Sequence, residues 1–314
     1  MPVRTSHLSN DGGLDADQRN DEPLRLCEMR LPVEGYRLNS LTETIGYIGL
    51  LDDEDIELDS AALALSSLDH EGQDLEAYLD QLRTISEAVE AACEQRVAAD
   101  LASGEAQGAL LAEVIGERLG FTGDRDSYDA PLNADMIRVL DRRRGLPVSL
   151  SILYVAAARR MGWRADALNT PSHVLVSIGP TDASALIDPF SGGRQVRPEQ
   201  LLALLEQVSG AGSWPSQAHV APMSNRMTLV RLLINQASRA EQAGDTFRAK
   251  TLYERMTVMA PDHGAGWWEL ARLQLVHREV GEARASLGAM LEVTRDAERR
   301  AHIHAALAQL TTGD

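Results

Sequence analysis

The chain has 314 residues, of which 44% are hydrophobic, 25% charged and only 4% aromatic. It carries 30 Lys and Arg against 47 Asp and Glu, a formal net charge of -17 at pH 7, which argues against a broad nucleic-acid-binding surface. The composition indicates a globular, helix-rich protein of two or three domains. The first ~22 residues lack the apolar region of a signal peptide, and the longest apolar run, 146–158, is too short for a membrane span.

The two cysteines, Cys27 and Cys93, lie far apart and form neither a CxxC pair nor a zinc-binding pattern. This usage fits a reducing compartment and argues against a disulfide framework. We therefore expect a cytoplasmic protein that binds neither nucleic acid nor membrane. No metal ion or cofactor is expected.

The N-terminal third is predicted to consist of a tail followed by helices. Residues 1–23 are rich in Asp, Asn and Gly and are expected to be disordered. Residues 24–120 are predicted to form a helical lead-in region, in which one helix has its apolar side chains on one face: Leu75, Leu79, Leu82, Ile85 and Val89. The acidic run at 52–59, DDEDIELD, is interpreted as a solvated helix start or loop rather than a metal site.

Residues 121–212 are predicted to be an α+β core built around one helix over about 147–161. Pro147 suits the first turn of that helix, and Gly162 suits its left-handed stop. The helix is apolar almost all round, so we expect it at the centre of the domain. Arg159 and Arg160 fall in its last turn, where a positive charge interacts favourably with the helix dipole.

Short β-type runs follow this helix and carry His173 and Asp188. A central helix after a glycine turn, followed by strands that bear one His and one Asp, is the layout of a papain-like or transglutaminase-like thiol site. In that chemistry a Cys at the helix N-terminus is held as a thiolate by the imidazole, and the Asp orients the imidazole. His173 and Asp188 are the candidates for these two supporting roles.

Residues 220–314 are predicted to form tetratricopeptide repeats, which have a period of about 34 residues. With Pro261 as the closing proline of one unit, small and aromatic side chains fall at the positions that the repeat requires: Gly244, Ala249, Tyr253, Trp267, Leu270, Ala271, Ala283 and Leu287. Stacked helix pairs of this kind leave a concave groove, so a protein or peptide partner is expected there.

The segments NADMIRVLDRRRGLPVSLSILYVAAARRMG, PSHVLV and LIDPFSGGR, followed by the repeats, resemble the bacterial Sir-B type transglutaminase-like proteins. The resemblance covers about residues 40–310. The matching positions are Asn133, Arg142 or Arg143, Gly145, Pro147, Ser149, Leu150, Tyr154, Arg160 and Gly162. It implies a transglutaminase-like, papain-like α+β fold for the core, between the helical lead-in and the C-terminal repeats.

The resemblance also locates the nucleophile position. Active transglutaminase-like enzymes begin the central helix with Gly-x-Cys, and counting back from Gly162 places Pro147 where that Cys belongs. This predicts a pseudoenzyme, non-catalytic or weakly catalytic, which acts in protein–protein interaction or regulation through its repeats. The alternative is a hydrolase or acyltransferase that uses Ser149, His173 and Asp188 on peptide or amide substrates. Both hypotheses remain open from the sequence.

A basic cluster before the helix has two interpretations. Arg142, Arg143 and the nearby Asn133 are candidates for an anion site or for the rim of the active site, because a helix N-terminus and guanidinium groups both bind anions. The alternative is a solvated turn whose arginines pair with acids such as Asp135 and Asp141.

Overall fold

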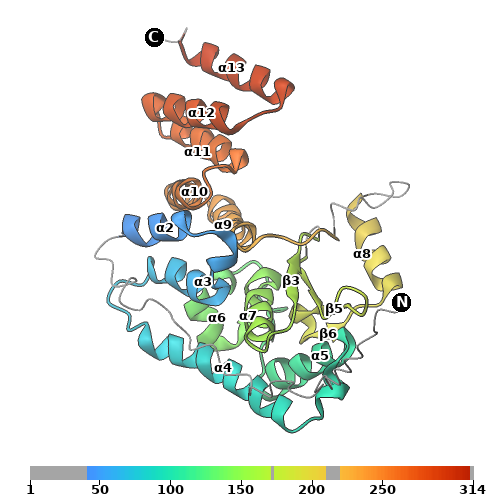
Figure 1. Cartoon of the computed structure of the whole chain (residues 1–314). Coiled ribbons are helices and arrows are strands. Elements are labelled where there is room, and N and C mark those ends of the chain that lie inside the picture. Colours follow the sequence, from blue (N-terminus) through green and yellow to red (C-terminus); the bar gives the residue numbers. More distant parts are fainter. Residues whose placement is uncertain (1–40, 171–172, 210–219, 312–314) are drawn as a thin grey trace, which may run out of the picture.

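The computed structural model describes residues 41–170, 173–209 and 220–311 (Figure 1). The tail predicted over 1–23 and Cys27 lie outside the described residues. The architecture is α+β, as predicted: a mainly helical body has a small sheet at one side, and a column of helices extends from the body toward the C-terminus (Figure 1).

The lead-in region is helical, as predicted. Its elements are α2 (Leu41–Leu50), the 3-10 helix η1 (Asp53–Asp55), α3 (Leu58–Ser67), α4 (Glu76–Glu94), η2 (Ala98–Leu101), α5 (Gly104–Leu111) and the π-helix η3 (Ala112–Arg118). Helix α4 buries Leu82, Ile85 and Val89 on the predicted face, and Leu75 and Leu79 are partly buried against the core.

The interpretation of the acidic run at 52–59 as a solvated segment is wrong for its last member. Asp59 is 2% exposed and forms an ion pair with Arg160. Asp53 also has a structural role, because its carboxylate accepts the backbone N–H groups of Asn225 and Arg226.

The central region contains the strands. Its elements are β1 (Thr122–Gly123), η4 (Pro131–Ala134), α6 (Met136–Arg142), β2 (Arg144–Gly145), α7 (Pro147–Arg160), β3 (Ala165–Leu168), β4 (Leu175–Ile178), β5 (Ala185–Asp188), η5 (Pro189–Ser191), β6 (Arg194–Gln195) and α8 (Pro198–Ser209). Strands β3 to β6 form one antiparallel sheet in chain order, whereas β1 and β2 pair in parallel.

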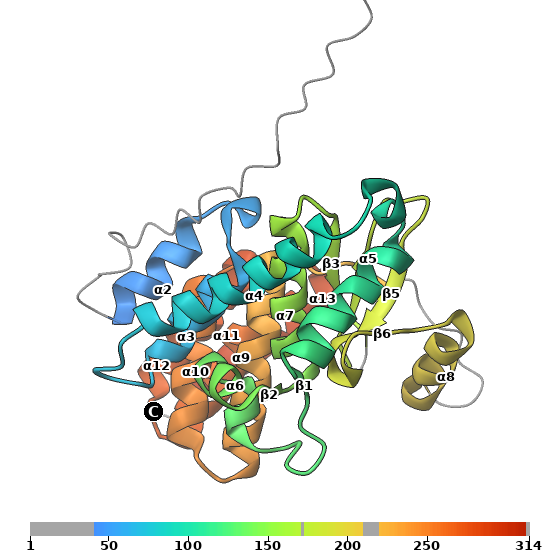
Figure 2. The ribbon, with the colours of Figure 1, turned by 90° about the horizontal axis from the view of Figure 1, so that it is seen from below.

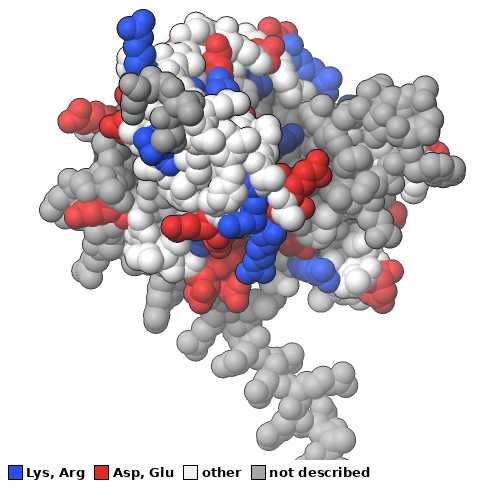
Figure 3. Space-filling model, turned by 90° about the horizontal axis from the view of Figure 1, so that it is seen from above, with Lys and Arg blue, Asp and Glu red and all other residues white. Residues whose placement is uncertain are grey.

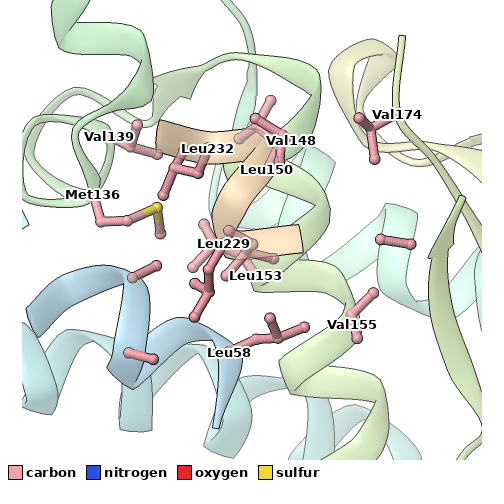
Figure 4. Close-up of a cluster of buried hydrophobic side chains, with 14 of the residues drawn as sticks. Leu58, Met136, Val139, Val148, Leu150, Leu153, Val155, Val174, Leu229 and Leu232 are labelled. Carbon is pink, nitrogen blue, oxygen red and sulfur yellow. The ribbon is translucent and has the colours of Figure 1, made fainter. Parts of the chain in front are cut away.

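Helix α7 is the central helix that the sequence predicts. It begins at Pro147, ends at Arg160 and is followed by Gly162 in the left-handed region, with φ 72°. Leu150 and Leu153 are almost fully buried and lie in an apolar cluster between the lead-in helices, the sheet and α9 (Asn225–Gln242) (Figure 4). The helix therefore lies in the middle of the body and positions the chain segments on either side of it, β2 and β3.

The C-terminal region is helical and is built from α9 (Asn225–Gln242), α10 (Thr246–Met259), α11 (Gly264–Val276), α12 (Val280–Val293) and α13 (Ala297–Thr311). Each helix packs against the next in chain order. The buried side chains of α9 and α10 belong to the main core, whereas a second, smaller cluster joins α11, α12 and α13. The column is thus continuous with the body at its base.

Hydrogen bonds and ion pairs connect the base of this column to the lead-in helices. The Asn225 amide donates to the carbonyl oxygen of Asp53 at 2.8 Å. Asp69, in the turn after α3, accepts hydrogen bonds from Arg248 and Arg255 of α10. Burial opposes ionisation of Asp69, but the two arginines outweigh it and lower the pKa of its carboxyl below the usual 3.8.

Candidate functional site

His173 and Asp188 form a hydrogen-bonded pair at the ends of neighbouring strands. His173 lies just before β4, and Asp188 is the last residue of β5, which pairs antiparallel with β4. Their Nε2 and Oδ1 atoms are 2.8 Å apart, and each side chain is 16% exposed. Asp188 also accepts the backbone N–H of Phe190 at 3.0 Å and so caps η5. The carboxylate is thereby fixed on the imidazole.

The electrostatics of the pair favour an ionised Asp188. Burial opposes the charge of this carboxylate, but hydrogen bonds from His173 and Ser191 outweigh it and lower its pKa. At neutral pH a carboxylate only accepts hydrogen bonds. The N–H hydrogen of His173 is therefore on Nε2, which donates a hydrogen bond to Asp188. In the neutral imidazole the acceptor lone pair is then on Nδ1. This is the arrangement of an oriented general base.

Within the described residues, no hydrogen bond joins the start of α7 to this imidazole. Pro147 occupies the first helical position and is buried. Ser149 is fully buried, and its hydroxyl lies 2.8 Å from the carbonyl oxygen of Asn133 and 3.0 Å from that of Leu146, while it accepts the Leu146 N–H at 2.9 Å. The structure therefore brings His173 together with Asp188 but leaves Ser149 bound to backbone groups.

Arg142 is hydrogen-bonded to both Asn133 and Asp124. Arg142 donates from Nη2 to Asp124 at 2.6 Å and from Nη1 to the side-chain oxygen of Asn133 at 2.9 Å. The hydrogen bond from Arg142 lowers the pKa of Asp124, whose side chain is 6% exposed. Arg142 thus pairs with an acid in the loop after β1 instead of one on α6. Two of the three residues proposed for an anion site are engaged within the protein.

Arg143 and Arg144 remain on the surface. Arg143 ends α6 in the left-handed region with φ 54° and donates to the carbonyl oxygen of Leu119 at 2.9 Å. Arg144 begins β2 and donates to the carbonyl oxygen of Gly120 at 3.0 Å. Both side chains make hydrogen bonds to uncharged groups and keep their positive charge at the surface.

An aromatic cluster around Phe190 was not predicted from the sequence. The Phe190 ring meets the His173 ring edge-on at a centroid distance of 5.9 Å and the Tyr128 ring at 5.6 Å. The Arg125 guanidinium lies 5.5 Å from the Phe190 centroid. A Cβ at Gly123 would come within 2.4 Å of this ring, so only glycine leaves room for it. The segment IDPF, which places an aromatic two residues after the Asp, was the available signal.

Tyr154 of α7 was also not predicted as a site residue. Its hydroxyl is buried and has no hydrogen-bond partner within the described part of the chain. Burial, and secondarily the charge of Asp188, raise its pKa. An added Cβ at Gly193 would lie 2.9 Å from this hydroxyl, so the turn after η5 packs tightly on Tyr154. Tyr154 supports the chain segment that carries Asp188.

Among the described residues, no three His, Cys, Asp or Glu side chains are grouped closely enough to hold a metal ion. Cys93, on α4, is partly buried, and burial raises the pKa of its thiol. None of the described helices is both long and apolar enough to cross a membrane.

Comparisons with known proteins locate relatives of the core. The profile of the transglutaminase-like superfamily matches residues 76–234. A UPF0162 protein of Xylella fastidiosa (strain 9a5c) is 28% identical over 237 residues, 74% of this chain and 82% of the relative. F-box only protein 21 of Homo sapiens is 35% identical over 102 residues, 30% of this chain and 16% of that protein. A crystal structure of menin aligns with 83% of this chain and 73% of its own, at 14% identity and a TM-score of 0.38, too low to support a shared fold.

Proposed function

Because the chain belongs to the transglutaminase-like superfamily, we propose that it is a member without its own thiol nucleophile, a pseudoenzyme of the cytoplasm that binds a protein partner through α9–α13. The observation that carries the proposal is the start of α7. Pro147 fills the first helical position, and the hydroxyl of Ser149, two residues further along, is fully buried on backbone groups. A base without an adjacent nucleophile performs no acyl transfer.

The partner surface is proposed from the C-terminal column, whose helices we interpret as tetratricopeptide-like pairs. Apolar side chains are exposed where α10 and α12 begin and α11 ends: Phe247 at 67%, Val276 at 58% and Val280 at 38%. The Phe247 and His277 rings lie 4.0 Å apart, which joins these ends into one patch, here called the 247–280 patch. Exposed apolar side chains grouped in this way are typical of protein contacts.

The charge pattern of the column fits a protein partner. The view from above shows an area without charged side chains, bordered by both acidic and basic ones (Figure 3). Interfaces of non-obligate complexes typically have such an uncharged centre and a polar rim. Lys250 and Glu279, which form an ion pair, connect α10 with the turn before α12 next to the 247–280 patch.

The binding proposal is tested with the full chain, because removing α9 and α10 would open the main core. The double variant Phe247→Ser with Val276→Ser is compared with Val97→Ser, whose side chain is exposed to the same 67% elsewhere on the body. We expect the double variant to lose cross-linked partners that the wild type and the control retain. Equal recovery by all three proteins would remove the column as the partner surface.

The absence of a nucleophile is tested by installing one. The variant Pro147→Cys would place a thiol at the first turn of α7, where the helix dipole and His173 lower the pKa of a thiol. We expect it to react with iodoacetamide faster than free cysteine at pH 7, and the additional change His173→Ala to slow it. Equal rates in the two variants would show that His173 does not serve this position.

The second candidate function is a serine hydrolase or acyltransferase, and the intact His173–Asp188 pair is the observation that favours it. It requires the Ser149 hydroxyl to leave its backbone partners and reach the imidazole. A fluorophosphonate probe tests this directly, with labelled peptides identified by mass spectrometry. Labelling of Ser149 in the wild type that disappears in His173→Ala would replace the pseudoenzyme proposal by this one.

A further inference from the structure

Four arginines without a carboxylate partner in the described residues lie on segments that adjoin the strands and the turn carrying the His173–Asp188 pair. Arg125, Arg143, Arg144 and Arg194, here called the arginine rim, make no ion pair with an Asp or Glu of the described segments. Their neighbours differ, since Arg118 pairs with Glu113 and Arg142 with Asp124. In a chain with a net charge of -17, positive side chains left without an acidic partner favour an anionic ligand.

The strand pairings bring the arginine rim to the turn that follows Asp188. In the β1–β2 pair Arg144 lies opposite Thr122, whose hydroxyl donates to the carbonyl oxygen of Phe190 at 3.3 Å. Arg194 is the cross-strand partner of Asp188 in the β5–β6 pair, so the two side chains share a face of the sheet. Figure 2 shows β1 and β2 near α7, and β1 contacts η5, the turn that follows β5.

Each of these guanidinium groups has donors to spare. A guanidinium carries five N–H donors. Arg125 uses Nη2 on the Ser191 hydroxyl at 3.2 Å, and Arg143 and Arg144 use Nη1 on carbonyl oxygens. These acceptors are neutral, so the positive charges stay uncompensated and further N–H groups are available for a ligand.

The backbone at Arg143 supports a role for its side chain. A φ of 54° lies in the left-handed region, which glycine adopts at no steric cost and which arginine rarely occupies. Residues held in this region often cluster at functional sites. The Arg125 guanidinium lies over the Phe190 ring, which in turn meets the His173 ring.

We propose that the arginine rim binds the carboxylates of a short acidic peptide segment of a partner protein, with the segment lying over the His173–Asp188 pair. Planar guanidinium groups bind carboxylates through two parallel hydrogen bonds, which matches the free donors of the rim. A long nucleic acid would extend onto the acidic remainder of the surface and be repelled, whereas a short peptide contacts only the rim. This surface lies on the transglutaminase-like core and is separate from the 247–280 patch.

The experiment measures fluorescence anisotropy of a labelled peptide of alternating Glu and Ala, with the Gln–Ala peptide as its uncharged match. The test variant is Arg125→Gln with Arg144→Gln. Arg284→Gln serves as the control, because this arginine of α12 is exposed and makes no ion pair in the described residues. We expect the double variant to bind about tenfold more weakly, since two exposed pairs of ordinary strength are lost. The control should bind as the wild type does.

A variant of opposite sign sharpens the test. Asp126 is exposed next to Arg125, so Asp126→Asn should strengthen binding of the acidic peptide and leave the Gln–Ala peptide unaffected. Circular dichroism melts show whether the variants stay folded. All the substituted side chains are exposed, so unchanged melts are expected.

Three results would overturn the proposal: equal affinity for the Glu and Gln peptides, unchanged affinity in the double variant, or displacement of the peptide by inorganic phosphate at the same concentration as by unlabelled peptide. The last result would assign the rim to free phosphate. The variant Phe247→Ser with Val276→Ser should bind the acidic peptide normally, so failure of the rim and failure of the column are told apart.

Discussion

The ion pair between Asp59 and Arg160 gives a sharp test of how α7 is held. Both Oδ atoms of Asp59 accept from the Arg160 guanidinium, at 2.7 and 2.8 Å, and the Asp59 side chain is 2% exposed against 17% for Arg160. The pair joins α3 to the last turn of α7 across 101 residues of sequence. Arg160 also donates to the Ser86 hydroxyl of α4 at 3.1 Å.

The magnitude follows from burial. Removing one member of a buried pair leaves the other charge without compensation and costs about 3–5 kcal/mol, whereas replacing both by apolar side chains is often close to neutral. Asp59→Asn keeps the shape of the side chain and removes its charge, so we expect it to lower the free energy of unfolding by about 3–5 kcal/mol. Asp59→Leu with Arg160→Met should cost clearly less than Asp59→Asn alone.

The assay is urea unfolding followed both by circular dichroism and by tryptophan fluorescence, because coincident curves justify a single free energy of unfolding. The control pair is Arg138 and Asp141, which lie 3.6 Å apart with side chains 51% and 37% exposed. Its removal should cost less than about 1 kcal/mol. A loss below about 1 kcal/mol for Asp59→Asn would refute the reasoning that this pair is buried and structurally coupled.

Further predictions concern the core, the start of α7 and the acid limit. Leu153→Ala should lower the free energy of unfolding by about 2–5 kcal/mol through cavity formation, and an unchanged urea midpoint would contradict the central position of α7. Ser149→Ala should lower the free energy of unfolding by about 1 kcal/mol, because the backbone groups of Asn133 and Leu146 lose the buried hydroxyl. The lowered pKa of Asp69 means that its ion pairs stabilise the fold above pH about 3.8 and are lost as pH falls through the lower folded value. Acid titrations of Asp69→Asn should therefore show a weaker loss of stability in that range than those of the wild type.

Local sequence patterns were sufficient to predict helix α7 but not the polar contacts between distant segments. The apolar circumference and the Pro147 and Gly162 signals predicted α7 to within a residue or two, because helix starts and stops are encoded in neighbouring residues. The partner of Arg142 was out of reach of such signals. Asp124 lies in a loop 18 residues away, and only the parallel pairing of β1 with β2 brings it to the guanidinium.

The same limit applies to the acidic run and to the base of the C-terminal column. A stretch as charged as DDEDIELD is usually solvated, yet Asp53 and Asp59 bind groups from α9 and α7. Periodicity within one helix indicates which face is buried but not which distant segment buries it. The same limit applies to the candidate site. The sequence predicted that His173 and Asp188 follow one another on neighbouring strands. It did not predict the backbone partners of Ser149, because these depend on how η4 lies against α7.

Several residues that match the transglutaminase-like family connect separate segments of this structure through hydrogen bonds. Asn133 accepts from Arg142, Ser149 ties the first turn of α7 to η4, and Arg160 anchors its last turn to α3. None of these contacts requires a nucleophile at position 147. Helix α7 is thus fixed at both ends by interactions independent of thiol chemistry, so the fold keeps the His173–Asp188 pair in place whether or not a reaction occurs there. An imidazole that the fold already orients needs less ordering when a ligand binds than a free one does, which favours a binding role for this pair.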